Sequence, residues 1–347
     1  MRIPRRTVLA LGVLLPKFSL ADEGLKLVRE LKPISSWPRA RMKAPKWTNG
    51  VLISVQNHDT VNPLIWIADA AGQRTIPFRV SGASVLRVDD FDQNRDGIVG
   101  LSGYAADSEG RVSGFVAFIY PNGECRVVQT SLYRPVRLAM GPDGTIWTAG
   151  YEVAVSAAGK PLTALLPNAT VIRRFHKDGN LIGSYIPQST IGEARYLSSP
   201  HHAIVASMNR VAWYTVGGRL VEIATNGVSI SDNLIAAPVE EESLLMSGFG
   251  LTNPGGVYLA TYRVRKGSGS EPDEAFDEKF KLNRRTNKWE MLRSSPSGNG
   301  DIENGTLGGV EDDSFVILNH TRVRMYKPAN VGVKNMSAEG AEGCRRE

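Results

Sequence analysis

The chain has 347 residues, 42% of them hydrophobic and 22% charged, which is an ordinary composition for a folded globular protein. Its net charge of +6 includes Arg2, Arg5, Arg6 and Lys17, with no acidic residue among the first 21, so removal of that segment would leave +2. A nearly neutral chain gives no general case for binding nucleic acid or an anionic membrane surface.

The first 21 residues have the pattern of a secretory signal peptide. A basic start precedes the apolar core "VLALGVLL" at residues 8–15, and "SLA" at 19–21 supplies small residues for cleavage. This core is shorter than the about 20 apolar residues that span a bilayer, and no later stretch reaches that length. "PRRTVLA" also resembles the twin-arginine signal. We therefore expect a periplasmic or secreted protein, exported by the Sec or the twin-arginine route; the alternative is a buried N-terminal strand.

Only two cysteines occur, Cys125 and Cys344, which excludes a zinc or iron–sulfur framework built on cysteine. We expect both to be free thiols. Residues 329–347 show no apolar period and predict a flexible C-terminal tail. Residues 22–328 are then left for a single domain, which we expect to be monomeric.

Two kinds of segment alternate along this domain, and both indicate an all-β fold. The first kind is a short, mostly apolar strand rich in small residues, which is typical of strands buried on both faces. We predict these to be the inner strands of the fold. They are "GVLISVQ" (50–56), "DGIVGLSG" (96–103), "DGTIWTAG" (143–150), "HHAIVASM" (201–208), "ESLLMSGFG" (242–250) and "DDSFVILNH" (312–320).

The second kind is a longer hairpin with alternating apolar residues and a polar turn. The five hairpins are "IWIADAAGQRTIPF", "GFVAFIYPNGECRVVQT", "VIRRFHKDGNLIGSYIP", "VAWYTVGGRLVEIA" and "FKLNRRTNKWEML". Four of them have a turn glycine where φ can be positive, at Gly72, Gly123, Gly179 and Gly218. Asn287 takes that place in the fifth hairpin.

This alternation predicts a β-propeller of six four-stranded blades. The inner strands begin 46, 47, 58, 41 and 70 residues apart, close to the roughly 40–50 residues of a propeller blade. Residues 152–170 and 265–277 are insertions that explain the two long intervals. The sixth copy is short, so we expect the N-terminal segment to complete it with a strand from residues 24–33. A seven-bladed ring and a pair of β-sandwiches are the alternatives.

Residues 134–187 resemble the blades of NHL-type and streptogramin-lyase-like propellers. The resemblance rests on "VRLAMGPDGTIWTAG" and "VIRRFHKDGNLIGSYIP", which match an apolar strand, a "GPDG" turn, a strand with Trp, and a "DG" hairpin. It implies a six-bladed propeller. It implies no particular activity, because propellers serve many functions, and the paired His and Glu of the lyase are not assigned to residues of this sequence.

The segment "DQNRDG" at residues 92–97 is the strongest local motif. Asp92, Asn94 and Asp96 place three oxygen ligands around one turn, as a calcium loop requires. The twelfth position of an EF-hand would be Glu and is Gly103, so an EF-hand is excluded. A calcium site of another kind would need Asp89 or Asp90 as well. The alternative is an Asx turn without metal.

A binding site is expected at one mouth of the propeller axis. Its candidate residues, which lie at or just beyond the ends of the predicted inner strands, are His58, Tyr104, Tyr151, Glu152, Phe249 and His320. His201 and His202 precede their strand, so we expect them at the opposite mouth.

We therefore expect a ligand-binding or protein-binding module rather than an enzyme, with a small molecule, a glycan or a protein as partner. The first alternative is a metal-dependent hydrolase or lyase of the gluconolactonase or streptogramin-lyase kind, with His58 and His320 near the metal. The second is a structural scaffold whose axis is filled by side chains.

Overall fold

The structure is a computed structural model in which the chain forms six antiparallel sheets. It describes residues 25–31, 41–43, 52–56, 61–69, 72–155, 161–166, 168–198, 200–238, 244–265, 274–296, 308–309, 315–318 and 323–328. The predicted signal peptide, the predicted tail and Cys344 lie outside these residues. Within them no helix is long and apolar enough to cross a membrane.

Each sheet is one propeller blade, and its strands are hydrogen-bonded from the axis outward. Blade 1 contains β2 (Arg41–Lys43), β3 (Leu52–Gln56), β4 (Leu64–Asp69) and β5 (Gly72–Pro77). Blade 2 contains β6 (Val85–Gln93), β7 (Val99–Ala106), β8 (Val112–Ile119) and β9 (Cys125–Ser131). Blade 3 contains β10 (Tyr133–Met140), β11 (Ile146–Val155), β13 (Thr170–Phe175) and β14 (Leu181–Pro187).

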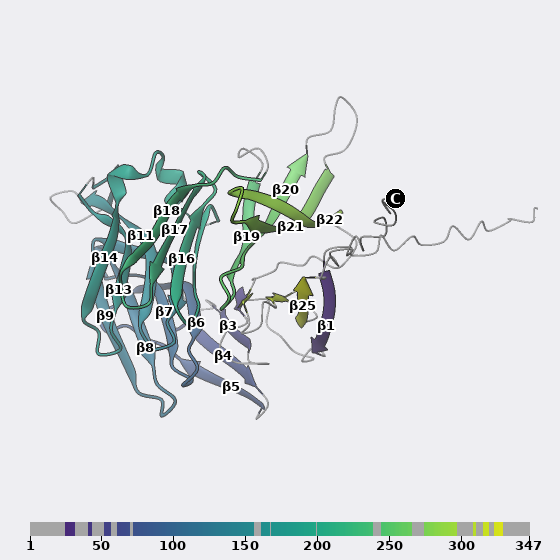
Figure 1. Cartoon of the computed structure of the whole chain (residues 1–347). Coiled ribbons are helices and arrows are strands. Elements are labelled where there is room, and N and C mark those ends of the chain that lie inside the picture. The colour runs from purple at the N-terminus through teal and green to yellow at the C-terminus, as the bar shows by residue number, and fades with distance from the viewer. Residues whose placement is uncertain are drawn as a thin grey trace, which may run out of the picture.

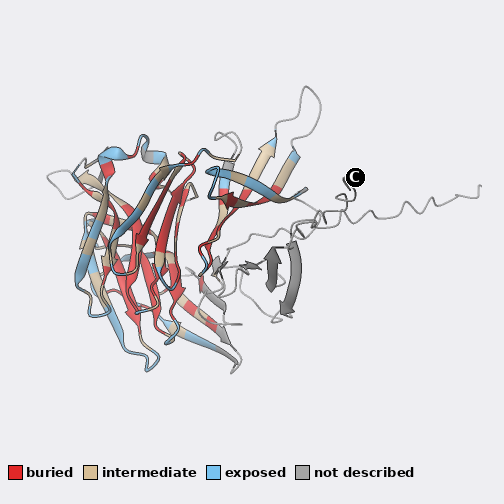
Figure 2. Cartoon of the chain, in the orientation of Figure 1, coloured by how far each residue is buried: buried red, intermediate tan, exposed pale blue. Residues whose placement is uncertain are grey.

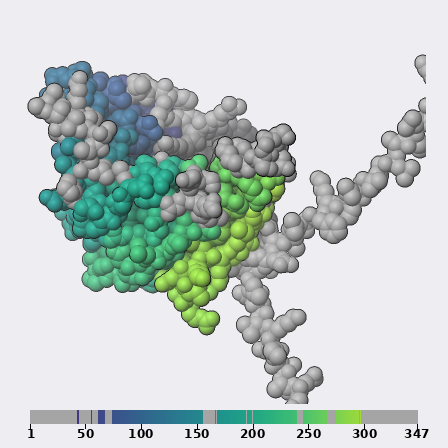
Figure 3. Space-filling view, turned by 90° about the horizontal axis from the view of Figure 1, so that it is seen from above, coloured from purple at the N-terminus to yellow at the C-terminus, as the bar shows by residue number. Residues whose placement is uncertain are grey.

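The remaining blades repeat this order along the chain (Figure 1). Blade 4 contains β15 (His202–Ala206), β16 (Arg210–Thr215), β17 (Arg219–Ala224) and β18 (Ser229–Leu234). Blade 5 contains β19 (Leu244–Leu251), β20 (Val257–Arg265), β21 (Glu274–Asn283) and β22 (Lys288–Pro296). Blade 6 contains β23 (Gly308–Gly309), β24 (Phe315–Leu318), β25 (Val323–Pro328) and β1 (Leu25–Leu31). Seen from above, blades 2 to 5 follow one another in chain order (Figure 3).

The N-terminal strand completes the last blade, as the sequence predicted. Strand β1 pairs antiparallel with β25, from Leu25 opposite Pro328 to Leu31 opposite Val323. Figure 1 shows the two strands side by side although they come from opposite ends of the chain. Leu25–Leu31, within the predicted range 24–33, therefore supplies the outermost strand of blade 6.

The prediction of the inner strands was wrong for four blades. The apolar strands β3, β7, β11 and β24 are the second strands of their sheets, and only β15 and β19 are innermost. The innermost strands β6 and β10 read "VLRVDDFDQ" and "YRPVRLAM", and they carry charges because their axial edge faces polar groups of other blades. Second strands have blades packed on both faces, which explains their apolar character.

The two predicted insertions differ in form. Residues 152–170 include the extra strand β12 (Pro161–Leu165), which pairs with the end of β11. Two short 3-10 helices, Gln188–Thr190 and Ala194–Leu197, connect blade 3 to blade 4. Residues 265–277 include the end of β20 and the start of β21, and residues 266–273 lie outside the described part of the chain. Asn287 has φ +52° in the turn between β21 and β22, as the sequence predicted.

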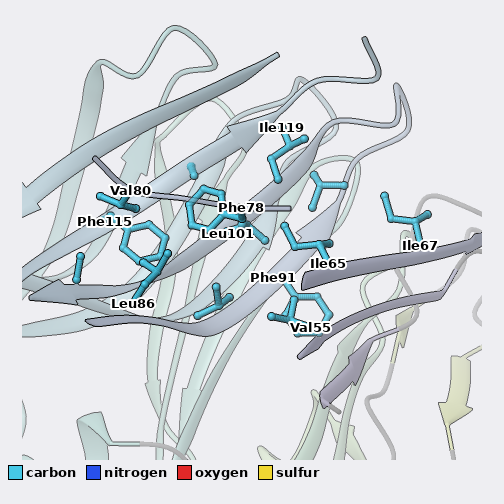
Figure 4. Close-up of a cluster of buried hydrophobic side chains, with 14 residues drawn as sticks. Val55, Ile65, Ile67, Phe78, Val80, Leu86, Phe91, Leu101, Phe115 and Ile119 are labelled. Carbon is cyan, nitrogen blue, oxygen red and sulfur yellow. The ribbon is translucent and has the colours of Figure 1, made fainter. Parts of the chain in front are cut away.

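The core lies between the blades and not within one sheet (Figure 2). Between blades 1 and 2, Ile65 and Phe78 pack against Phe115 and Leu101, and the rings of Phe78 and Phe115 lie 5.5 Å apart (Figure 4). Between blades 4 and 5, Tyr214 stacks on Phe249, with ring centroids 5.8 Å apart. Face-to-face packing of blades buries what a single four-stranded sheet would expose.

Candidate functional site

Four innermost strands begin at the same end of the axis, which we call the N mouth. At this end β6, β10, β15 and β19 start, and their second strands β7, β11, β16 and β20 finish because each pair is antiparallel. Positions in different blades are equivalent when they lie the same number of paired residues away from the turn that joins the first strand to the second. The first-strand positions are Arg87, Arg134, His201 and Leu245, opposite Tyr104, Tyr151, Val216 and Tyr262.

A bulge shapes this end of blades 2 and 3. The register shifts at Asp89 in β6 and at Val136 in β10. Opposite each bulge lies a glycine, Gly103 or Gly150, at which a Cβ would lie 2.0 Å from a carbonyl oxygen of the innermost strand. A bulge bends its strand and re-aims nearby side chains. The two glycines are therefore needed for the backbone path that presents Arg87 and Arg134.

Two arginines share one carboxylate between blades 2 and 3. Arg87 Nε lies 3.1 Å from Asp89 Oδ1, and Arg134 Nη2 lies 3.4 Å from Asp89 Oδ2. The guanidinium of Arg134 covers the ring of Tyr104, with 4.2 Å from Cζ to the ring centroid. The Asp89 side chain is only 7% exposed, whereas those of Arg87 and Arg134 are 47% and 34% exposed. We call Arg87, Asp89, Tyr104 and Arg134 the arginine clamp.

Deeper along the axis, polar side chains join the innermost strands. Lys43 of β2 contacts Asp90 of β6 at 3.5 Å and donates to the Leu138 carbonyl of β10 at 3.0 Å. Asp90 Oδ2 accepts the amide of Leu138 at 2.8 Å, and Asp92 Oδ2 accepts that of Met140 at 2.9 Å. Burial raises the pKa of Asp92, and the charge of Lys43 partly opposes this shift. These contacts join the innermost strands of blades 1 to 3.

Glu152 and Tyr151 also lie at the N mouth, on blade 3. The Glu152 carboxylate pairs with Arg173 of β13. Its backbone amide donates to Gln188 Oε1 at 2.8 Å, and Gln188 Nε2 returns a hydrogen bond to the Glu152 carbonyl at 2.9 Å. Tyr151 is half-buried against the core between blades 3 and 4. The charge of the Glu152 carboxylate is thus neutralised by Arg173, and the Glu152 backbone is held by Gln188.

His202 is fully buried at the start of β15. Its Nδ1 accepts the indole N–H of Trp213 at 3.1 Å, which leaves Nε2 as the protonated nitrogen of the neutral ring. Arg137 Nε donates to the His202 carbonyl at 3.0 Å. Burial, assisted by the charge of Arg137, holds the pKa of His202 well below its usual 6.5. His202 is therefore a neutral core group, although it lies at the N mouth.

The segment 92–97 forms a tight turn between β6 and β7. Asn94 Oδ1 accepts the amide of Ile98 at 2.8 Å, and Gly97 has φ +81°. The two Asp92 oxygens accept the amides of Gln93 and Met140. Asn94 Nδ2 lies 3.4 Å from Asp96 Oδ2. These bonds are those of an Asx turn, and calcium remains a prediction of the sequence alone.

The structure places Tyr104, Tyr151 and Glu152 at one mouth, and their role in binding stays a prediction. Phe249 is elsewhere: it is 3% exposed and lies in the core between blades 4 and 5. His58 and His320 fall outside the described residues. The sequence predicted that His201 and His202 lie at the mouth opposite to the other two histidines. That prediction assumed that all of these histidines flank inner strands that run in the same direction. That premise is wrong, because β3 and β24 are second strands and β15 is innermost.

Sequence reasoning missed Arg87 and Arg134. Each lies ten residues before the glycine of a "DG" turn, Gly97 or Gly144, so an alignment of the two blades on those turns would have paired them. The partial exposure and clustering of the two arginines could not be read from that spacing.

Comparison with known proteins identifies no family for this chain. No family model and no curated protein matches the chain. A solved β-propeller domain of Cps50 (Swd1) from Myceliophteria thermophila is 14% identical, with a TM-score of 0.39, over 86% of this chain and 98% of that one. A solved luciferin-regenerating enzyme is 12% identical, with a TM-score of 0.45, over 89% of this chain and 95% of that one.

Proposed function

We propose that this chain is an exported β-propeller that binds a ligand at the N mouth. The arginine clamp carries the proposal. It combines partly exposed guanidinium groups with an aromatic ring, between two blades that present equivalent residues. Propeller mouths collect loops and strand ends from several blades, and ligands bind where a few polar groups converge on an otherwise apolar surface.

The axial contacts direct binding to the mouth. Lys43, Asp90 and Asp92 join three innermost strands below the clamp, so the ligand meets the rim and does not enter a channel there. This packing also fits the scaffold alternative, in which the axis is filled. The clamp favours binding over a scaffold, because its arginine side chains are 47% and 34% exposed at the mouth and Arg134 Nε has no hydrogen-bond partner among the described residues. The alternative hydrolase or lyase depends on His58 and His320, outside the described residues.

A broad binding screen tests the proposed function. Purified protein is heated with a library of metabolites that includes sugars, amino acids, short peptides, carboxylates and phosphates, and Tm is measured. We expect at least one class to raise Tm and to lose that effect in Tyr104→Ala, which removes one wall of the clamp. Binding that is unchanged in Tyr104→Ala, or no binding at millimolar concentration across the library, would contradict a site at the N mouth.

A further inference from the structure

The arginine clamp has unused capacity for an anion. Each guanidinium has five N–H donors, and Asp89 takes one nitrogen from each arginine, Arg87 Nε and Arg134 Nη2. Among the described residues the terminal nitrogens of Arg87 have no other partner, and Arg134 Nε is buried without one. The two guanidinium groups of the clamp therefore retain N–H groups, held in a fixed geometry, that could donate hydrogen bonds to an anion.

The charge of the clamp is also unbalanced. One carboxylate faces two guanidinium groups, which leaves a net charge of +1. The neighbouring charges are paired: Lys43 with Asp90, and Glu152 with Arg173. Within the part of the chain that the structure describes, the positive charge that these pairs leave over belongs to Arg87 and Arg134. In blade 4, His201 occupies the position equivalent to those of Arg87 and Arg134.

The surroundings favour an organic anion. Tyr104 lies under Arg134, and Tyr151 and Tyr262 occupy the equivalent positions of blades 3 and 5. Tyrosine offers an apolar ring to the body of a ligand and a hydroxyl to its polar groups. The guanidinium fork matches the two oxygens of a carboxylate.

We propose that the clamp binds the carboxylate of an organic acid, held by Arg87 and Arg134. This inference rests on the proposed function and adds the chemical class of its ligand. Asp89 holds both arginines in place before the ligand arrives, and the stack on Tyr104 orients Arg134. Groups that are already oriented lose less conformational entropy on binding.

Calorimetric titration tests the inference with defined probes. Citrate and malonate supply carboxylates, malonamide is the uncharged counterpart of malonate, and inorganic phosphate is an anion without an organic body. We expect citrate or malonate to bind, malonamide not to bind, and the affinity to fall as salt rises because the site is partly exposed.

Substitutions locate the site. Arg87→Gln and Arg134→Gln should each weaken carboxylate binding at least tenfold. Arg134→Lys keeps the charge but lacks the fork, so its affinity should lie between those of wild type and Arg134→Gln. The control is Arg285→Gln, which removes an exposed arginine from the turn between β21 and β22 at the other end of the blades and should leave the affinity unchanged. Circular dichroism and Tm verify that every variant is folded.

Several results would overturn the inference. They are equal binding of malonamide and malonate, binding of phosphate alone, or carboxylate binding that survives both glutamine substitutions. If an uncharged compound binds in a Tyr104-dependent manner while carboxylates do not, the proposed function stands and this inference fails. If nothing binds at the N mouth, both fail.

Discussion

Gly150 shows how a single residue fixes the shape of the mouth. A Cβ at this position would lie 2.0 Å from the Arg134 carbonyl oxygen, and relief would require the backbone of β10 to move. Gly150→Ala should therefore lower the free energy of unfolding by about 1–3 kcal/mol, as overpacking does. Denaturant unfolding measures the change.

Gly192→Ala is the matched control. The φ of Gly192 lies outside the left-handed region, and no atom lies within 4 Å of the added Cβ. The free energy of unfolding should therefore change by less than about 0.5 kcal/mol. Equal losses in the two variants would show that the close approach of β10 and β11 is not the cause.

The buried ring of His202 makes the free energy of unfolding depend on pH. Above pH 6.5 the ring is neutral in both states and contributes no slope. As pH falls below 6.5, the unfolded state binds a proton that the buried ring resists, so stability declines until the lowered pKa of the folded state is reached. Arg137 and His201 face the ring and add to this resistance.

We expect His202→Gln to reduce the fall in Tm between pH 7 and pH 5.5. His176→Gln is the control for a histidine outside the core, because His176 is only partly buried in the turn between β13 and β14, where it contacts Asp178; it should change the slope less than His202→Gln does. Identical slopes in wild type and His202→Gln would contradict the assignment of a neutral buried ring.

At the element scale, one buried carboxylate joins blades 4 and 5. Glu222 of β17 accepts from Arg284 at 2.7 and 2.8 Å and from Arg210 at 3.2 Å, and its side chain is 1% exposed. Burial opposes ionisation of Glu222, but the bonds from Arg284 and then Arg210 outweigh it, so its pKa lies below the usual 4.5.

Glu222→Gln leaves two arginines without their anion and should destabilise the protein by about 3–5 kcal/mol at pH 7, the cost of breaking a buried pair. Glu222 contributes stability above pH 4.5 that is lost as pH falls through its lowered pKa. The difference between wild type and variant should therefore shrink in acid. A difference that is constant from pH 7 to pH 3 would contradict this account.

Strand β1 should stabilise the protein although it is only seven residues long. Deletion of residues 22–33 would leave β25 with an unpaired edge, and such edges promote aggregation. We expect a lower Tm and more aggregation on heating. Deletion of residues 329–347, the predicted tail, should leave Tm unchanged. Equal Tm values for the two deletions would show that closure by β1 adds no stability.

For the whole molecule, the repeat was predictable and its radial order was not. Turn glycines and apolar runs repeat at blade length, so the sequence indicates six blades and the closing strand. It misplaces the inner strands because β6, with Asp89, Asp90 and Asp92, looks too polar to be internal. Several of the partners of those charges lie on β2 and β10, which are distant in sequence. For the same reason Tyr104 was predictable as a mouth residue and its partner Arg134 was not.

Calcium is testable on the intact protein. The oxygens of Asp92 and Asn94 already accept backbone amides in the turn that joins β6 to β7. We therefore expect a chelator to leave Tm unchanged and added calcium to have no effect. A fall in Tm on chelation, restored by calcium and lost in Asp96→Asn, would establish the calcium loop instead.

The central claim is that the N mouth between blades 2 and 3 is the binding site. The most direct measurement is a calorimetric titration of the tightest-binding compound from the screen into wild type, Tyr104→Ala and Arg285→Gln. The account predicts equal affinity for wild type and Arg285→Gln and at least tenfold weaker binding for Tyr104→Ala. Equal affinity in all three proteins would contradict it.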